Sequence, residues 1–361
     1  MTAAPAGTMR AVVVPRHGGP EVLEIVERPI PRPGPGEVLV RVHAAGINHL
    51  DTFVRRGMPG IKLPLPMTPG SDAAGVIAAL GPDPEAASGG APLPKVGDRV
   101  FVSPGYSCER CEACYSGHEP LCRHYGLLGE HRDGTQAEYL ALRATHVLPL
   151  PEGISFEAGA AFPLVFLTAW QMLVGRAALR AGETVLIQAG GSGVGSAAIQ
   201  IAHLLGARVL TTVGSDDKVA KARALGADVV INYRTSDFLD AARKATEKRG
   251  VDVVVENTGQ ETWERSLLAL AKGGRLVTCG ATTGYAANTD LRHVFFKSLS
   301  ILGSTMGSRA DLLRIARFVG EGRLKPVVDR VLPLDQVADG HRALAERSLF
   351  GKIVLTTGGA A

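Results

Sequence analysis

Residues 184–215 read TVLIQAGGSGVGSAAIQIAHLLGARVLTTVGS, and this stretch decides the fold. Residues 184–189 form a short apolar run that is typical of a buried strand, and residues 190–195 are rich in glycine. Residues 194–205 then show helical periodicity, and residues 208–213 make a second apolar run. Strand, turn, helix and strand in this order predict a parallel β-α-β unit.

The same alternation continues through the part of the chain that follows residue 151. Nearly all-apolar strands between helices are buried on both faces, so the pattern predicts an α/β domain with a doubly wound parallel sheet. Further strands are expected at residues 228–231, 251–255, 275–279 and 352–355, and further helices at residues 217–225 and 309–321.

The first 150 residues predict mainly β-structure. Residues 37–45, 73–80 and 99–103 are alternating or apolar runs, and Gly/Pro turns separate them. Residues 81–94 are rich in Pro, Ala and Gly and predict a surface loop. At about 150 residues per domain, a chain of 361 residues is expected to form two domains.

Charge and apolar content narrow the range of partners. The formal net charge is only +4, and no stretch combines Lys and Arg with interleaved aromatic residues, so we expect no nucleic acid partner. The longest apolar run, residues 158–174, is interrupted by Pro163, Thr168 and Gln171. A lone membrane helix needs about 20 consecutive apolar residues, so this run predicts a buried helix between domains and no membrane partner.

The N-terminus has no basic segment followed by an apolar one, so we expect no signal peptide and a cytoplasmic protein.

The glycine-rich turn predicts a site for a dinucleotide. Glycines let the backbone approach a pyrophosphate, and the free N–H groups at a helix start stabilise its negative charge. The turn departs from the G-x-G-x-x-G pattern because a serine occupies the second glycine position. The alternative is a tight strand–helix turn without a ligand. The residues expected to contact the cofactor are Gly190, Gly191, Ser192, Gly193, Val194 and Gly195.

The end of the second strand bears on the choice of cofactor. An NAD site usually places Asp or Glu there, to accept hydrogen bonds from the ribose hydroxyls. Here the tip ends in Gly214 and Ser215, and the first acids are Asp216 and Asp217. A small tip with Lys218 nearby predicts binding of a 2′-phosphate, so NADPH is expected, with NADH as the alternative. On that alternative, Lys218 is a solvated helix residue.

Four of the five cysteines occur in the pattern Cys108-x2-Cys111-x2-Cys114-x7-Cys122. Four thiolates can close a tetrahedral shell around Zn²⁺ that leaves no position for water or substrate, so the pattern predicts one structural zinc. A ferredoxin-like run would have three residues before its last Cys and a Pro after it. The alternative is a cysteine-rich loop without metal. Cys279 ends an apolar strand and is expected to be a buried, inert thiol.

Together these motifs resemble the medium-chain dehydrogenase/reductase superfamily. The resemblance covers nearly the whole chain, through the cysteine motif and the glycine turn. It also includes Ala-Ala-Gly-Ile-Asn at residues 44–48, Val-Gly-Asp-Arg-Val at residues 96–100 and Phe-Gly-Lys at residues 350–352. The glycine-turn variant with serine resembles that of quinone oxidoreductases more than that of liver-type alcohol dehydrogenases.

The resemblance implies an α/β chain with a GroES-like β-barrel catalytic domain and a Rossmann domain. The catalytic domain would span residues 1–155, with a structural zinc lobe at about 105–125, and the Rossmann domain would span residues 156–300. Residues 301–361 would form the sheet edge and dimer segment and return to the catalytic domain. Because residues 300–304 resemble a segment that extends the sheet across a dimer interface, a homodimer or homotetramer is expected.

Zinc alcohol dehydrogenases in this superfamily hold a second, catalytic zinc with a Cys, a His and another Cys. Here Asn48 replaces the first Cys, Gly70-Ser71-Asp72 replaces a Gly-His-Glu motif, and residues 162–165 contain no Cys. An amide and a hydroxyl are poor ligands for Zn²⁺ compared with thiolate and imidazole, so we expect no catalytic zinc. Asp72 is then either a remnant of the lost site or the partner of an arginine such as Arg55.

The resemblance also implies roles for single residues. Asn48 is expected at the nicotinamide and the acceptor, although a turn asparagine that bonds to backbone is the alternative. His49 is expected either to donate a proton or to lie near the cofactor phosphates, unless it is only a partly buried histidine. Asp51 orients a neighbouring group in the relatives. Thr168 matches a position that contacts the nicotinamide, and Tyr233 matches a tyrosine that contacts the 2′-phosphate.

The expected function is hydride transfer from NADPH to a conjugated carbon–carbon double bond or a quinone. Reduction of such an acceptor develops charge on a distant oxygen, which hydrogen-bond donors can stabilise without a metal. The first alternative is a zinc-type NAD(P)-dependent alcohol dehydrogenase, in which Zn²⁺ lowers the pKa of the alcohol. The second is a non-enzymatic NADPH-binding protein, which some lens crystallins of the superfamily resemble.

Overall fold

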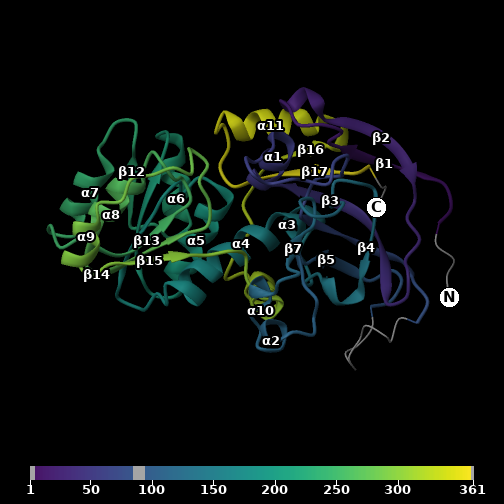
Figure 1. Cartoon of the computed structure of the whole chain (residues 1–361), viewed down its shortest axis with the longest axis horizontal. Helices are drawn as coiled ribbons and strands as arrows, with labels where there is room; N and C mark the ends of the chain where they lie inside the picture. The colour runs from purple at the N-terminus through teal and green to yellow at the C-terminus, as the bar shows by residue number, and fades with distance from the viewer. Residues whose placement is uncertain (1–4, 84–93, 359–361) are drawn as a thin grey trace. The chain divides into compact units, whose positions relative to one another are not determined.

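The computed structural model describes residues 5–83 and 94–358. It divides into two compact units, shown with the colours of the chain in Figure 1. The first unit holds the described parts of Met1–Leu164, Ser308–Gly320 and Pro326–Ala361, and the second holds Val165–Gly307 and Glu321–Lys325. The first boundary falls later than the expected residue 155, because helix α3 (Phe156–Ala161) packs against strands of the first unit.

The second unit contains a six-stranded parallel sheet with the strand order β12-β11-β10-β13-β14-β15. The chain starts in the middle of this sheet, builds outward to one edge, and then builds from the middle to the other edge. This order is that of a doubly wound dinucleotide-binding sheet, whose ligands bind beyond the carboxyl ends of the strands where the order reverses. The strands are β10 (Thr184–Ile187), β11 (Arg208–Val213), β12 (Val229–Asn232), β13 (Val251–Glu256), β14 (Leu270–Thr278) and β15 (Ser300–Gly303).

Helices lie around this sheet (Figure 1) and bury its two faces. One core cluster joins Leu186 and Leu210 of the central strands to Phe238 and Leu267 of the helices. The apolar run at 158–174 was expected to form one helix, but it is divided among α3, α4 and a π-helical turn. The elements are α4 (Pro163–Trp170), η5 (Gln171–Arg176), α5 (Gly193–Leu204), α6 (Asp217–Ala224), α7 (Phe238–Ala245), α8 (Trp263–Ala269) and α9 (Leu291–Phe296).

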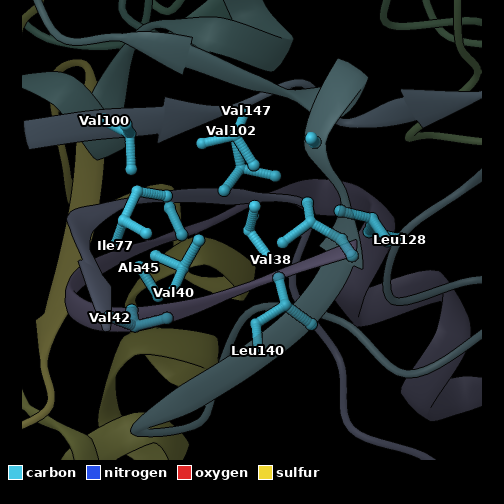
Figure 2. Packing of buried hydrophobic residues seen from close by; sticks show 13 residues of the cluster. Val38, Val40, Val42, Ala45, Ile77, Val100, Val102, Leu128, Leu140 and Val147 are labelled. Atoms are coloured by element: carbon cyan, nitrogen blue, oxygen red, sulfur yellow. The ribbon is translucent and has the colours of Figure 1, made fainter. Parts of the chain in front are cut away.

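The first unit is built on a mostly antiparallel sheet with the order β16-β17-β3-β4-β5-β9, and β8 also pairs with β3. Alternate residues of β3 face one core, in which Val38, Val40 and Val42 meet Ile77 and Val102 (Figure 2). The strands are β3 (Glu37–Ile47), β4 (Asp72–Leu80), β5 (Arg99–Val102), β8 (Tyr139–Arg143), β9 (Val147–Pro149), β16 (Val328–Pro333) and β17 (Lys352–Thr356).

Two small two-stranded sheets and four further helices complete the first unit. The sheets pair β1 (Thr8–Val13) with β2 (Glu24–Pro29), and β6 (Gly105–Tyr106) with β7 (Gly126–Leu127). The helices are α1 (His49–Arg56), α2 (Glu112–Tyr115), α10 (Arg309–Gly320) and α11 (Val337–Ala345). Short 3-10 turns are η1 (Pro20–Val22), η3 (Glu119–Leu121), η4 (Ala144–His146) and η6 (Leu334–Gln336).

The expected surface loop at residues 81–94 lies largely outside the described residues. Among the residues that are described, no helix is long and apolar enough to span a membrane. The alternation of strands and helices after residue 184 is confirmed. One difference is β14, which begins at Leu270 rather than at residue 275, because Leu270 already pairs with Val251 of β13; another is β16, which was not among the expected strands.

Candidate functional site

The glycine turn joins β10 to α5 in the second unit. Ser192 is the N-cap of α5, and its Oγ accepts a hydrogen bond from the N–H of Gly195 at 3.0 Å. The first-turn N–H groups of Gly193 and Val194 have no partner within the helix and face the same end. A helix of this length also carries partial positive charge at its N-terminus, so the turn has the chemistry of an anion site.

Close packing explains two glycines of the turn. A Cβ on Gly190 would lie 2.2 Å from the Oγ1 of Thr211, and a Cβ on Gly195 would lie 2.1 Å from the carbonyl oxygen of Ala189. The residue that adopts a left-handed conformation is Ala189, with φ of 53°. The serine at the second glycine position is therefore a helix cap, and the unusual backbone conformation is carried by an alanine that the sequence pattern did not mark.

At the tip of β11, the hydroxyl of Ser215 donates a hydrogen bond to the carboxylate of Asp217, which lowers the pKa of that carboxyl. Asp216 accepts a hydrogen bond from the Nδ2 of Asn232 at 2.8 Å, so one of its oxygens is already engaged. The Tyr233 side chain lies over Gly214, where an added Cβ would be 2.6 Å from the tyrosine hydroxyl. The structure thus brings together Gly214, Ser215 and Tyr233, and Lys218 lies in the first turn of α6.

Thr168 lies in α4 and is buried. Its Oγ1 is 3.7 Å from the Sδ of Met306, which has a left-handed φ of 45°. Whether Thr168 contacts a nicotinamide stays a prediction.

The first unit contains a buried polar cluster around Asn48, the N-cap of α1. The Nδ2 of Asn48 donates to the Oδ2 of Asp72 at 2.9 Å, and its Oδ1 accepts from the Nζ of Lys352. Lys352 also contacts the Oδ2 of Asp72 at 3.1 Å and is only 4% exposed. Both ends of the Asn48 amide bond to charged side chains, and Asn48 also caps α1, so its place at the nicotinamide and the acceptor stays a prediction.

Asp72 is saturated by donors from three parts of the chain. Its second oxygen, Oδ1, accepts from the backbone N–H of Leu164 at 2.8 Å. The expectation that it might pair with Arg55 is wrong. The Nε of Arg55 donates instead to the Nδ1 of His341 at 3.2 Å, and burial lowers the pKa of His341 to about 3, which leaves that imidazole as an acceptor.

This cluster does not fit a catalytic zinc. The Oγ of Ser71 donates to the carbonyl oxygen of Leu128 at 2.7 Å, so the hydroxyl is used as a donor. The Nζ of Lys352 holds a positive charge against the carboxylate that would otherwise be a ligand. An amide, a donating hydroxyl and a carboxylate already paired with an ammonium are a poor donor set for Zn²⁺.

Asp51 lies behind Asn48 and is fully buried. Its Oδ2 accepts from the backbone N–H of Asn48 at 2.8 Å and from the Nε2 of Gln136 at 3.1 Å, and its Oδ1 accepts from the N–H of Gly70. Burial raises the pKa of Asp51 to about 7, although these N–H donors act in the opposite direction. Asp51 therefore orients the backbone at Asn48 and closes the first turn of α1.

His49 is the first residue of α1 and lies among positive charges. Burial is the main cause that lowers its pKa, and the charges of Lys352 and Arg347 add to it, so that the pKa falls to about 4. The imidazole is therefore neutral at neutral pH. Whether His49 donates a proton or lies near the cofactor phosphates stays a prediction.

The four motif cysteines gather in one lobe of the first unit. Their sulfur atoms lie within 4.8 Å of one another, and the Sγ of Cys114 is 3.9 Å from that of Cys108 and 3.5 Å from that of Cys111. A tetrahedral shell with Zn–S bonds of about 2.3 Å places its sulfurs about 3.8 Å apart. The lobe therefore fits Zn²⁺. In the described part of the chain, this is the one group of three or more His, Cys, Asp or Glu residues with that geometry.

Glu109 anchors the cysteine lobe to the rest of the first unit. It lies between two of the cysteines with a left-handed φ of 61°. Its carboxylate accepts from the Nη1 of Arg309 at 2.6 Å, from Arg143 at 2.8 Å and from the hydroxyl of Thr145 at 2.8 Å. These donors outweigh burial and hold the pKa of Glu109 below its usual value. The loop that carries the thiols is thus tied to α10 and β8.

Comparison with known proteins establishes the class. The family model described as the alcohol dehydrogenase GroES-like domain matches residues 34–152, and the model described as a zinc-binding dehydrogenase matches residues 193–321. Together with the fold, these matches show that the chain belongs to the medium-chain dehydrogenase/reductase superfamily, whose members are NAD(P)-dependent oxidoreductases.

The names of individual relatives include quinone oxidoreductases and alcohol dehydrogenases. Quinone oxidoreductase from Homo sapiens is 34% identical over 356 residues, which cover 96% of this chain and 97% of the relative. Alcohol dehydrogenase from Schizosaccharomyces pombe is 30% identical over 347 residues, with 96% and 97% covered. A solved structure described as an NAD-dependent alcohol dehydrogenase has a TM-score of 0.91 and 51% identity, and the match covers 97% of this chain and all of that one.

Sequence reasoning missed Lys352 as a member of the site. The signal was present, because a lysine that opens a buried apolar strand must find a counter-charge. Lys352 belongs to the Phe-Gly-Lys motif, but nothing in the sequence indicates that β17 lies beside β3, the strand that leads to Asn48. Gln136 was missed for the same reason.

Proposed function

We propose that this protein is an NADPH-dependent reductase that transfers hydride to an activated acceptor without a catalytic metal. The acceptor class is a carbon–carbon double bond conjugated to a carbonyl, or a quinone. The observation that carries the proposal is the buried cluster of Asn48, Asp72 and Lys352, which supplies hydrogen-bond donors and a fixed positive charge.

The cluster could stabilise the negative charge that develops on the carbonyl oxygen of the acceptor during reduction. Lys352 donates to the Oδ1 of Asn48, and the Nδ2 of Asn48 donates one hydrogen to Asp72. Among the described residues, the second Nδ2 hydrogen has no acceptor and can donate to a bound acceptor. A preorganised donor of this kind is worth most in a water-poor site, because it needs no reorganisation during the reaction. The positive charge of the Lys352 ammonium would stabilise the negative charge on the same carbonyl oxygen.

The reaction is balanced without an added base or metal. When bound, NADPH supplies a hydride and is left oxidised. In an enone such a hydride would bond to the β-carbon and the π electrons would move to the carbonyl oxygen, for which the Asn48 amide would be the hydrogen-bond donor. Water then supplies a proton to the α-carbon. Burial lowers the pKa of His49 to about 4, so its side chain is a neutral imidazole, whose one N–H can still donate a hydrogen bond to the acceptor or to the cofactor phosphates.

The choice of NADPH rests on the tip of β11. Gly214, Ser215, Lys218 and Tyr233 combine a small backbone, hydroxyl donors and a cation, and the Asp216 carboxylate is engaged by Asn232. Such a group favours a 2′-phosphate over free ribose hydroxyls. NADH remains the alternative cofactor.

A second candidate function is NAD-dependent alcohol oxidation. The solved structure at 51% identity favours it, because that protein is described as an NAD-dependent alcohol dehydrogenase. The donor set around Asn48 argues against a zinc-assisted version. A third candidate, cofactor binding without turnover, would leave every acceptor unreduced.

The cysteine lobe is proposed to hold one structural Zn²⁺. Cys108, Cys111, Cys114 and Cys122 would be its four ligands, and the metal would staple a lobe that has little core of its own. Thiolates kept for zinc require a reducing compartment, which supports a cytoplasmic location.

A homodimer is proposed through the open edge of the parallel sheet, from which a homotetramer can form. Within the residues that the structure describes, β15 pairs only with β14, so its outer edge is open to another strand. Ile301 on this strand is 39% exposed, and Phe295 and Phe296 of the neighbouring α9 are exposed as well. An unpaired edge beside apolar side chains is what a second copy of the strand would cover.

The first prediction tests the reaction. With NADPH, the protein is expected to reduce benzoquinone or methyl vinyl ketone and not to oxidise ethanol with NAD⁺. Replacing Lys352→Met together with Asp72→Asn removes the buried charge pair without leaving a lone charge, and we expect kcat to fall at least about tenfold. Lys62→Met, at an exposed lysine, is the control and should retain full activity. Alcohol oxidation that exceeds quinone and enone reduction would overturn the proposal.

The second prediction concerns cofactor choice. Lys218→Ala should raise the Kd of NADPH about tenfold and change that of NADH less than about twofold, because only the former carries a phosphate at that position. Fluorescence titration at two salt concentrations measures both. Lys221→Ala, one turn further along α6, is the matched control. Tighter binding of NADH to the wild-type protein would reject the assignment.

The third prediction concerns the metal. Protein purified without added metal should contain about one zinc per chain by elemental analysis. Cys114→Ser should lose the metal and lower Tm by about 5 °C or more, whereas Cys279→Ser should keep it. The control is apt because burial, followed by the charge of Glu256, raises the pKa of Cys279 to about 12. Two zincs per chain would restore the zinc-dependent alternative, and none would remove the structural role.

The fourth prediction concerns assembly. Sedimentation equilibrium should give at least twice the chain mass of 37.8 kDa. Ile301→Lys should shift the protein to monomer, because it places a charge on the strand edge. Ile25→Lys, at a residue with similar exposure in β2, should leave the assembly intact. A wild-type monomer at micromolar concentration would contradict the dimer.

A further inference from the structure

A chain of hydrogen bonds runs beneath the glycine turn of the second unit. The backbone N–H of Ala189 donates to the Oγ1 of Thr212 at 3.0 Å, and that hydroxyl donates to the Oε1 of Gln188 at 2.8 Å. The Nε2 of Gln188 donates to the Oγ of Ser266 at 3.1 Å, and Ser266 donates to the Oε2 of Glu256 at 2.7 Å. The chain connects the carboxyl ends of β10, β11 and β13 through α8.

We call this series of hydrogen bonds from Ala189 to Glu256 the relay. Each bond in it donates toward Glu256, and the carboxylate of Glu256 fixes this direction. The carboxylate of Glu256 accepts from the backbone N–H groups of Thr258 at 2.8 Å and Gly259 at 3.1 Å, and from the hydroxyl of Thr262. A carboxylate that only accepts forces the Ser266 hydroxyl to donate to it. Ser266 then accepts from the Gln188 amide nitrogen, which turns the amide oxygen toward Thr212. The Thr212 hydroxyl is thereby left as an acceptor for the turn.

The side chains of the relay are buried, so water cannot compensate for the loss of any one of its hydrogen bonds. Gln188, Thr212, Ser266 and Glu256 are at most 2% exposed. A buried polar atom that loses its partner cannot replace it with solvent, so a break at one point is felt along the chain.

Thr212 holds two consecutive residues of the turn. Its hydroxyl accepts from the N–H of Ala189, and its carbonyl oxygen accepts from the N–H of Gly190 at 2.8 Å. Ala189 has φ of 53°, a conformation that an alanine rarely adopts unless its surroundings impose it. Its carbonyl oxygen in turn accepts from the N–H of Ser192 at 2.9 Å, directly at the cap of α5.

We propose that this relay is a positioning device for the dinucleotide. By holding Ala189 in its left-handed conformation, Thr212 and the buried groups behind it aim the N-terminus of α5 at the cofactor pyrophosphate. Thr212 also lies two residues before Gly214, so the same anchor fixes the origin of the tip of β11. The inference rests on the dinucleotide binding of the superfamily and does not depend on the acceptor or on the choice between NADPH and NADH.

The test breaks the relay at Thr212. Thr212→Val keeps the shape and removes the hydroxyl, so the Kd of NADPH and that of NADH should both rise about tenfold in fluorescence titrations. Thr212→Ser restores the hydroxyl and should bring both Kd values back to within about threefold of wild type. Ser266→Ala cuts the relay at its far end and should raise both Kd values at least about threefold.

A matched control separates positioning from general stability. The Oγ1 of Thr246 also donates to a carbonyl oxygen, that of Ala242 at 2.8 Å, and accepts from the N–H of Gly250 at 3.1 Å, away from the turn. Thr246→Val should lower Tm about as much as Thr212→Val and change neither Kd more than about twofold. The proposal is overturned if Thr212→Val binds both cofactors like wild type, if Thr212→Ser fails to rescue binding, or if Thr246→Val weakens binding equally.

The outcome is independent of the proposed reaction. A wild-type protein that prefers NADH, or that reduces no quinone or enone, would reject the reductase proposal while leaving the comparison between Thr212 and Thr246 variants intact. Equal affinities across these variants would reject the relay and leave the reductase proposal standing.

Discussion

The carboxylate of Asp72 is the constraint on which the first unit depends. A buried charge is tolerated only when every acceptor position meets a donor, and removing one partner of a buried pair destabilises a protein by about 3–5 kcal/mol. Asp72 meets Lys352 from β17, Asn48 from the start of α1 and the N–H of Leu164 at α4. Since β17 is supplied by the last part of the chain, the first unit is complete only after the chain has built the second unit and returned.

The second unit follows the same principle with a different compensation. Glu256 is buried as completely as Asp72, yet its carboxylate accepts hydrogen bonds from backbone N–H groups and hydroxyls rather than from a lysine. Dipoles that converge on a carboxylate can stabilise it while keeping the surroundings uncharged. Such a site holds a turn in shape through hydrogen bonds alone, without a lysine or arginine beside the carboxylate in the described residues.

The sequence predicted the features that have a local signature. The glycine turn, the strand Arg208–Val213 and the spacing of the four cysteines each follow from short-range chemistry, and the structure has them at the expected residues. The partner of Asp72 could not be predicted in this way, because Lys352 is far from it in the sequence and becomes its neighbour only through the register of β17 on β3. The division of the apolar run at 158–174 also depended on tertiary packing, since no local signal distinguishes a π-helical turn from a helix.

The paired state of Asp72 distinguishes this buried cluster from a zinc site. Turning the cluster into a zinc site would require thiolates at Asn48 and Leu164 and an imidazole at Ser71. None of these changes alone creates a metal site, because the Lys352 ammonium would still oppose a divalent cation. Each intermediate would also break a satisfied buried network. Several simultaneous substitutions therefore separate the present cluster from a zinc site.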